Sequence, residues 1–177
     1  MYRDNSLIPR EAIRLLALGI LAEHSTSYAA LAEQVRHFTG RIVGPSLDLV
    51  AQPLELLKVE GLVESAGSGQ DDLLALTEAG REELHRLLGA NVRPQINDLN
   101  KLIIAIKVRF LHLLPPEERQ VQTDILTEIF ERELARLSDL RAQDAAYSKH
   151  LSDWLDLEIK LTRERLAWFE ALGNAQR

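Results

Sequence analysis

The sequence predicts a mostly α-helical protein with a small β-wing, in which an N-terminal winged helix-turn-helix is followed by a C-terminal antiparallel helical dimerisation region. Three observations lead to this fold class. An amphipathic helix ends at Gly61 and is followed by two short β-prone runs around a tip rich in glycine and serine. The second run enters a new helix through Thr77, a residue type that favours helix N-caps. After residue 95 the apolar residues recur only at helical spacing.

The first two helices follow from the spacing of apolar residues. From Pro9 to about Glu23 the apolar positions are too dense for a surface helix, so this helix is expected to be mostly buried. Residues 25–27 form a short β-prone link. From Tyr28 to Phe38 a second helix carries its apolar residues on one face, and we expect it to end before a turn over residues 39–45.

A third helix is predicted from Ser46 to about Glu60, because Ser46 is a good N-cap and an acid follows in the first turn. Pro53 lies well inside this span, where it removes a backbone donor and crowds the preceding turn. The helix is therefore expected either to kink or to become regular late. The wing strands are predicted over residues 62–64 and 73–76, which completes the winged-helix order.

A boundary is expected near residues 89–94, where Gly89 and Pro94 interrupt the helical pattern. It divides the chain into a winged-helix domain, residues 1–90, and a helical dimerisation domain, residues 91–177. The second domain contains long amphipathic helices, the last with a seven-residue repeat typical of coiled coils. We expect these helices to cover their apolar stripes with a second copy of the chain. The candidate dimer contacts are Leu99, Ile103, Ile106, Phe110, Trp154, Leu161 and Trp168.

Several segments together resemble the PadR-like winged-helix transcriptional regulators, and within them the AphA-like branch. The segments are Leu-Ala-Leu-Gly-Ile-Leu at 16–21, Ser-Tyr-Ala-Ala-Leu at 27–31, residues 54–63, Leu-Thr-Glu-Ala-Gly at 76–80 and residues 110–119, which include Leu-Pro-Pro-Glu-Glu-Arg. The likeness covers most of the chain. It implies a homodimeric transcriptional regulator that binds a pseudo-palindromic operator in double-stranded DNA through the third helix, with the C-terminal helices forming the dimer.

The residues that would touch DNA depart from the family pattern. Many members have a tyrosine followed by proline in the third helix, where this chain reads Val50-Ala51-Gln52-Pro53. Tyr28 matches the family's tyrosine at the start of the second helix, and the resemblance implies a phosphate contact for it. Short basic clusters at helix ends either bind phosphates or complement the helix dipole, and both readings stay open here. The candidate DNA-binding residues are Tyr28, Arg36, His37, Arg41, Ser46, Gln52 and Lys58.

The charge distribution argues against strong DNA binding. Residues 1–90 carry eight Lys/Arg and thirteen Asp/Glu, whereas residues 91–177 carry thirteen and fourteen. From Ser46 to Asp72 the only basic residue is Lys58, against six acids. Attraction to phosphate would select the opposite sign. An alternative function therefore stays open, in which a degenerate winged-helix dimer acts as a protein-interaction or ligand-sensing module without strong DNA binding.

The sequence lacks the patterns of catalytic and metal sites. It has no cysteine, its five histidines are scattered, and it contains neither a glycine-rich phosphate loop nor a nucleophile elbow. We expect no catalytic residue, no metal and no cofactor, and the sequence does not define an effector. The longest apolar run is far shorter than the roughly 20 residues of a membrane span, and the first residues lack a signal-peptide pattern. These observations predict a cytoplasmic protein with no membrane partner.

Overall fold

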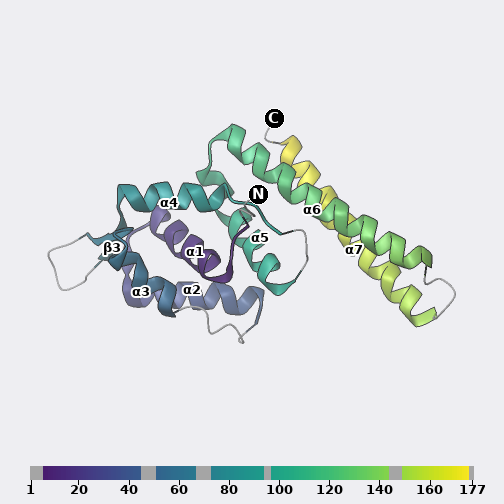
Figure 1. Ribbon diagram of the computed structural model, residues 1–177, viewed down its shortest axis with the longest axis horizontal. Coiled ribbons are helices and arrows are strands. Elements are labelled where there is room, and N and C mark those ends of the chain that lie inside the picture. Colours follow the sequence, from purple (N-terminus) through teal and green to yellow (C-terminus); the bar gives the residue numbers. More distant parts are fainter. Residues whose placement is uncertain (1–5, 45–50, 67–72, 94–96, 144–148, 176–177) are drawn as a thin grey trace, which may run out of the picture. The chain divides into compact units, whose positions relative to one another are not determined.

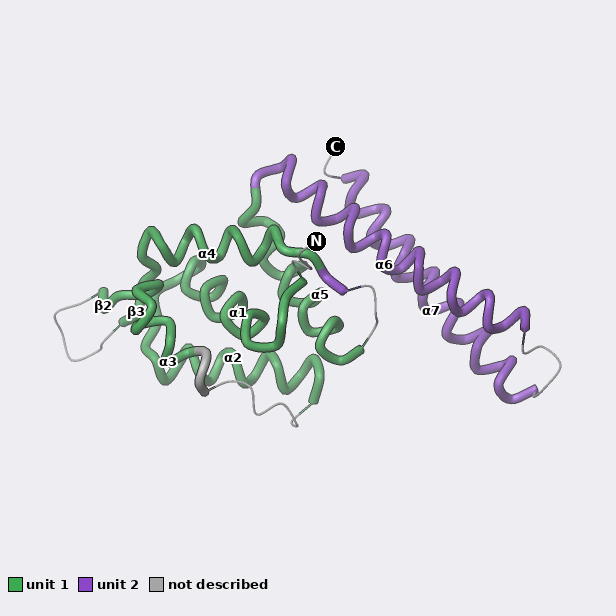
Figure 2. The backbone as a smooth tube through the Cα atoms, viewed as in Figure 1, with its two compact units in different colours: residues 1–91, 97–114 green, residues 92–96, 115–177 purple. Residues whose placement is uncertain are grey.

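The chain folds into two compact units, residues 1–91 with 97–114 and residues 92–96 with 115–177 (Figure 2). The computed structural model describes residues 6–44, 51–66, 73–93, 97–143 and 149–175, and the side chains of residues 51–53 are also outside the described set. Unit 1 holds five helices and a small sheet, and unit 2 holds two long helices (Figure 1).

The element order is that of a winged helix followed by a helical hairpin. Unit 1 contains α1 (Pro9–Glu23), β1 (Thr26–Ser27), α2 (Tyr28–Ile42), α3 (Ala51–Val59), β2 (Val63–Ser65), β3 (Leu73–Leu76), α4 (Glu78–Leu88), α5 (Asp98–Phe110) and the 3-10 helix η1 (Leu111–Leu113). Unit 2 contains α6 (Pro116–Gln143) and α7 (Lys149–Asn174). The three strands form one antiparallel sheet in the order β1-β3-β2. The predicted fold class, mostly helical with a winged helix, is confirmed.

Helix α1 is the buried centre of unit 1. Nine of its fifteen residues are buried, and it contacts α2, α3, α4, α5 and β3 (Figure 1). Pro9 occupies the start of the helix, where its missing N–H costs nothing. Each fully buried leucine or isoleucine stabilises the fold by about 1.5–3 kcal/mol, so the buried residues of α1 contribute much to the stability of this unit. The expectation of a mostly buried first helix is confirmed.

Helix α2 is longer than the sequence predicted. It continues beyond Phe38 to Ile42, so the prediction of a turn beginning at Thr39 is wrong. The buried Thr39 hydroxyl donates to the carbonyl oxygens of Val35 at 2.9 Å and Arg36 at 3.1 Å. A residue that often favours turns is thereby satisfied inside the helix. As a consequence Arg41 lies on the last turn of α2.

The turns that flank the wing have the predicted geometry. The Thr77 side chain caps α4 by accepting from the backbone N–H of Gly80 at 3.0 Å, and its hydroxyl donates to the carbonyl oxygen of Gly61 at 2.7 Å. Gly61 has a φ of 69°, a left-handed conformation that favours glycine after a helix. Strands β2 and β3 pair with Val63 opposite Leu76. The predicted wing tip, residues 67–72, lies outside the described residues.

Helix α5 packs within unit 1, and unit 2 takes up residues 92–96 and the chain from Pro115 onward. The ring of Phe110 fills the space beside Gly19 of α1, where an added Cβ would lie 2.5 Å from a ring carbon. The guanidinium of Arg109 lies over the rings of Phe38 at 5.2 Å and Phe110 at 4.9 Å. These contacts join α5 to α1 and α2.

Lys107 joins α5 to the end of α4. Its side chain is only 1% exposed, and Nζ donates to the carbonyl oxygens of Leu88 at 2.5 Å and Ala90 at 2.6 Å. Burial lowers the pKa of Lys107 to about 7, whereas carbonyl oxygens at a helix C-terminus favour the charged ammonium. The contact fixes the path of the chain where it leaves α4.

Unit 2 is an antiparallel hairpin of α6 and α7 (Figure 1). Part of its core is a cluster of Leu137, Leu155 and Ile159. Elsewhere the ring of Phe130 on α6 stacks on Phe169 of α7 with centroids 5.1 Å apart. Each helix therefore covers one apolar face of the other.

We predict that Gly80→Ala destabilises unit 1 strongly. An added Cβ at Gly80 would lie 2.0 Å from the backbone oxygen of Leu62, which cannot move without disturbing the turn into β2. The expected cost is about 1–3 kcal/mol or more, measured by urea unfolding. Gly40→Ala is the matched control, because its Cβ meets nothing within 4 Å and the helix gains about 0.5–1 kcal/mol. Equal stability of the two variants would contradict the packing described.

Candidate DNA interface

The outward face of α3 is apolar and acidic. Leu54 and Leu57 are buried and face the core of unit 1, whereas Leu56 and Val59 are 41% and 81% exposed. Glu55 is also exposed. With about 3.6 residues per turn, residues 55, 56 and 59 lie on the side of α3 away from its buried pair. Such a face offers apolar contact to thymine methyl groups but no positive charge to phosphates.

The polar candidates of the third helix are only partly placed. Lys58 is exposed at the end of α3, and its Nζ donates to the hydroxyl of Ser65 on β2 at 3.2 Å. Gln52 belongs to the first turn of α3, but its side chain is outside the described set, and Ser46 is outside the described residues. Lys58 is therefore the one candidate on this helix whose side chain the structure describes.

The exposed cations of the predicted site lie on the C-terminal half of α2. Arg36 pairs with Glu33 one turn earlier at 3.2 Å, and both side chains are exposed. His37 and Arg41 are exposed and make no ion pair with the residues that the structure describes. Exposed ion pairs contribute little, so Arg36 can exchange Glu33 for a phosphate at small cost. This cluster is the main basic surface among the predicted candidates.

Tyr28 lies at the opposite end of α2. Ser27 caps the helix by accepting from the backbone N–H of Ala30 at 3.3 Å, and Tyr28 follows as the first helical residue, 41% exposed. Thirteen residues of helix separate Tyr28 from Arg41, about 20 Å along the axis. The structure therefore spreads the candidates along α2 and does not gather Tyr28 with the basic cluster.

Two arginines of unit 1 are held in an internal ion-pair network. Arg14 of α1 pairs with Glu60 at 2.7 Å and Glu83 at 3.1 Å, and Arg86 pairs with Glu83 at 2.7 Å and Glu11 at 3.5 Å. The hydrogen bond from Arg86 is the main cause that lowers the pKa of Glu83; burial opposes it and Arg14 adds to it. Glu60 is one of the six acids between residues 46 and 72, and it has a cationic partner from α1.

The seven candidate dimer contacts fall into two groups. Ile103, Ile106 and Phe110 on α5 are at most 1% exposed, so their apolar area is already covered within one chain. Leu99 at the start of α5 is half-buried. The candidates on α7 are the exposed group, with Trp154 and Trp168 at 52% and 51% exposure and Leu161 half-buried.

These α7 residues form one stripe, which we call the α7 seam: Trp154, Leu157, Leu161 and Trp168. Their spacing places them on one face of α7, and Leu157 is 51% exposed. The face that packs on α6 carries other residues, including Leu155, Thr162 and Phe169. Trp168 is anchored by an edge contact with Phe169 at 4.8 Å between ring centroids. The seam is thus an ordered apolar surface that α6 does not cover.

The described residues contain no group of three or more histidine, aspartate or glutamate side chains that could hold a metal ion. Within the same part of the chain, none of the helices has the length and apolar character needed to cross a bilayer.

The chain belongs to the AphA-like transcriptional regulator family, whose model matches residues 2–173. A search of curated proteins found no match.

Among solved structures, the chain is similar to the crystal structure of Bacillus subtilis PadR, at 16% identity and a TM-score of 0.41 over 97% of this chain and 98% of that one. The crystal structure of the same protein in complex with operator DNA matches at 16% identity and a TM-score of 0.39, covering 93% and 98%. Its complex with p-coumaric acid matches at 15% identity and a TM-score of 0.41, covering 93% and 98%.

Two features of this surface were not found from the sequence. The exposure of Leu56 and Val59 could have been found by placing Leu54 and Leu57 inward on a helical wheel, because this leaves positions 56 and 59 outside. The pairing of Arg14 with Glu60 had no local signal, because 46 residues separate the two side chains.

We predict that Glu83→Gln lowers the free energy of unfolding by about 1–3 kcal/mol at neutral pH, because it removes a carboxylate that accepts from two arginines. Since the folded pKa of Glu83 lies below 4.5, this contribution is complete above pH 4.5 and is lost as the pH falls through the folded value. Denaturant unfolding at several pH values measures it. Glu82→Gln, a change at an exposed neighbour, should alter stability by less than about 0.5 kcal/mol. A gap between the two variants that persists in acid would refute the role assigned to Glu83.

Proposed function

We propose that the chain regulates transcription as a homodimer that binds a pseudo-palindromic operator in double-stranded DNA through α3 of each winged helix, and that it performs no catalysis. The observation that carries the proposal is the third helix. Leu54 and Leu57 hold it in the core, and its opposite face is open to a ligand along Glu55, Leu56 and Val59. Membership in a family of transcriptional regulators supports the same conclusion.

The contacts to DNA divide between two helices. Leu56 and Val59 of α3 meet base edges in the major groove, where apolar side chains recognise thymine methyl groups. The basic cluster of α2, Arg36, His37 and Arg41, neutralises phosphates that flank the groove. With so few cations, each winged helix binds weakly, and the dimer gains affinity by engaging two half-sites at once.

We infer that the two chains meet along the α7 seam in antiparallel orientation. In the seven-residue repeat of the seam, Asp153 and Lys160 flank one side and Glu158 and Arg165 the other. A parallel pair would place Asp153 against Glu158 and Lys160 against Arg165, both like-charged. An antiparallel pair places Glu158 of one chain against Arg165 of the other, on both sides of a twofold axis close to Leu161.

Charge and exposure agree with this orientation. Glu158 and Arg165 make no ion pair with any residue in the described part of the chain, so both are available to a partner. Trp154 and Trp168 lie seven residues on either side of Leu161, and an antiparallel pair buries the indole of each near the other end of the partner helix. A twofold axis of this kind also gives the symmetry that a pseudo-palindromic operator requires.

A second candidate function follows from the same α3 surface. The exposed Leu56 and Val59 beside Glu55 suit a basic, partly apolar protein segment at least as well as DNA. In this alternative the winged helix is a protein-interaction module. Leu56→Ala and Val59→Ala separate the two functions, because they change the sequence preference of a DNA complex only if α3 enters the groove.

We predict that Arg41→Gln and Arg36→Gln each weaken binding to the promoter DNA of the protein's own operon. Each change removes about one phosphate contact, so the slope of log affinity against log salt falls by about one unit per half-site. Fluorescence anisotropy at several salt concentrations measures the slope.

Arg81→Gln provides the control with the same change of net charge. Arg81 is exposed on α4, and its guanidinium lies 4.0 Å from the carboxylate of Glu78. It belongs to a different helix from the basic cluster of α2. It should leave the slope unchanged. Equal losses in Arg41→Gln and Arg81→Gln would show that only total charge matters, and the absence of sequence-preferring binding at low salt would refute the DNA-binding function.

We predict that Glu158→Arg and Arg165→Glu each weaken dimerisation about threefold to tenfold, and that the double variant restores it. Each single change opposes two like charges across the seam, whereas the double change recreates opposite charges. Sedimentation equilibrium measures the dimer dissociation constant.

The parallel arrangement predicts the opposite sign, because Glu158→Arg would then face Asp153 and strengthen the dimer. Leu161→Asp is a further check, since it places two carboxylates near the axis and should give monomers. A wild-type chain that is a stable monomer at micromolar concentration would refute the homodimer itself.

A further inference from the structure

Glu55 is an exposed carboxylate set among apolar side chains on the outward face of α3. Its neighbours on this face are Leu56, 41% exposed, and Val59, 81% exposed. Leu54 and Leu57 are buried on the opposite side of the helix. Four residues of helix separate Glu55 from Val59, which puts them on one face about 6 Å apart along the axis. A single acidic acceptor therefore stands beside an apolar surface.

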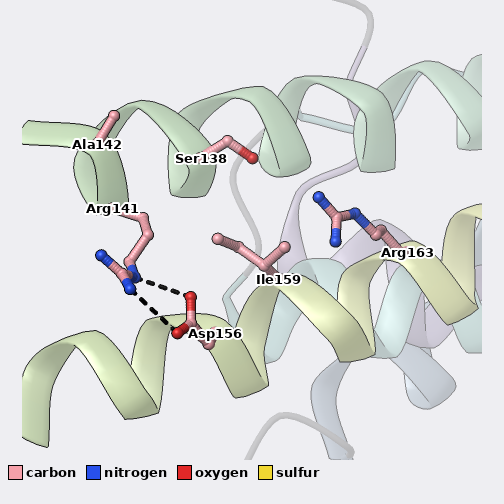
Figure 3. A pocket seen from close by; sticks show the side chains of 6 residues that line it. All are labelled: Ser138, Arg141, Ala142, Asp156, Ile159 and Arg163. Carbon is pink, nitrogen blue, oxygen red and sulfur yellow. Dashed lines mark hydrogen bonds and ion pairs between the residues drawn. The ribbon is translucent and has the colours of Figure 1, made fainter. Parts of the chain in front are cut away.

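The carboxylate of Glu55 is available to a ligand. It makes no hydrogen bond or ion pair with any residue in the described part of the chain. Lys58 follows at a spacing that suits an ion pair within a helix, but its Nζ donates to the Ser65 hydroxyl at 3.2 Å. Other exposed carboxylates are held by cations: Asp156 accepts from Nε and Nη2 of Arg141 at 2.8 and 3.2 Å (Figure 3).

The four bases differ in what they offer to such a carboxylate in the major groove. Cytosine presents its N4 amino donor there, whereas guanine presents the acceptors N7 and O6 and thymine presents the acceptor O4 beside its methyl group. Adenine has a donor next to an acceptor. An ionised carboxylate only accepts hydrogen bonds, so cytosine satisfies it best and guanine repels it most.

The apolar neighbours make this choice of base more selective. When Leu56 and Val59 pack against a base edge, they remove water from the side of Glu55 that faces the DNA. A carboxylate that loses water without gaining a donor destabilises the complex. The wrong base is therefore penalised more strongly than it would be at a fully hydrated contact.

We propose that Glu55 determines part of the operator sequence: its carboxylate accepts from the amino group of a cytosine, next to thymines whose methyl groups contact Leu56 and Val59. This role depends on the proposed entry of α3 into the major groove. The spacing of about 6 Å along α3 places the cytosine and the thymines within about two base-pair steps of 3.4 Å. The acid on α3 thus lowers affinity for DNA in general and raises selectivity for one half-site.

Selection of bound duplexes from a randomised DNA library by the full chain at low salt tests the proposal. In each half-site we expect one position at which cytosine is enriched about fivefold or more, with thymines within two base pairs. Glu55→Gln should move the enrichment at that position to adenine, because a glutamine amide pairs with both N6 and N7 of adenine. Glu82→Gln makes the same change of net charge at an exposed residue of α4 and should retain cytosine.

A second measurement tests the apolar part of the contact. Replacing the selected thymines by deoxyuridine removes only their methyl groups, and wild-type binding should weaken about fourfold for each methyl group that is contacted. Leu56→Ala should reduce this difference between the thymine and deoxyuridine duplexes. Equal wild-type affinity for the two duplexes would contradict the proposed thymine contacts.

The outcomes separate this inference from the DNA-binding function on which it depends. If the wild type selects no sequence at low salt, both are refuted, and the α3 surface is left for a protein partner. If the wild type selects a sequence and Glu55→Gln selects the same one, DNA binding stands and the role of Glu55 is refuted. A shift that Glu82→Gln shares would also refute it, because total charge would then explain the change. Unchanged thermal unfolding of Glu55→Gln establishes that its effect is local.

Discussion

The packing of α1 at the centre of unit 1 is the constraint on which this unit depends. Every element that matters for recognition is placed by its contact with this helix: α2 and α3 on the side of the candidate interface, and α4, α5 and β3 around the rest. The half-buried Arg14 of α1 reaches Glu60 beyond the end of α3 and Glu83 on α4. Helix α1 thus sets the packing of α3 and neutralises one acid beside it. Substitutions inside α1 should therefore change binding at α3 without contacting the ligand.

The charges of unit 1 are divided between folding and recognition. Arg14, Arg86 and the buried Lys107 stabilise the arrangement of α1, α4 and α5, whereas the described cations open to DNA lie mainly on α2. The acidic balance of this half of the chain therefore overstates the repulsion at α3, because Glu60 has a cationic partner. It remains a surface with few cations, so the proposed function relies on the affinity gained by engaging two half-sites at once.

Local signals predicted most of the fold. Periodicity placed the helices, and Thr77 and Gly61 marked the turns around the wing, because caps and left-handed turns depend on nearby residues. Long-range packing could not be predicted from the sequence. The apolar stripe of α5 has the same spacing whether it packs on α1 or on another chain. The last turn of α2 was also missed, because Thr39 favours turns in the sequence, whereas its hydroxyl is satisfied by carbonyl oxygens of the preceding turn of α2. In the candidate site, the sequence indicated the candidate residues. It did not indicate that Tyr28 and Arg41 lie at opposite ends of α2.

The distance between the two α3 helices in the dimer tests the central claim most directly. The chain has no cysteine and Val59 is 81% exposed on α3, so Val59→Cys gives a single spin-labelling site per chain. Double electron–electron resonance on the dimer free of DNA should then show one distance near 34 Å, about one turn of DNA, after allowance for the label. A lack of dipolar coupling, or a distance that leaves the two helices unable to reach adjacent major grooves, would contradict the account.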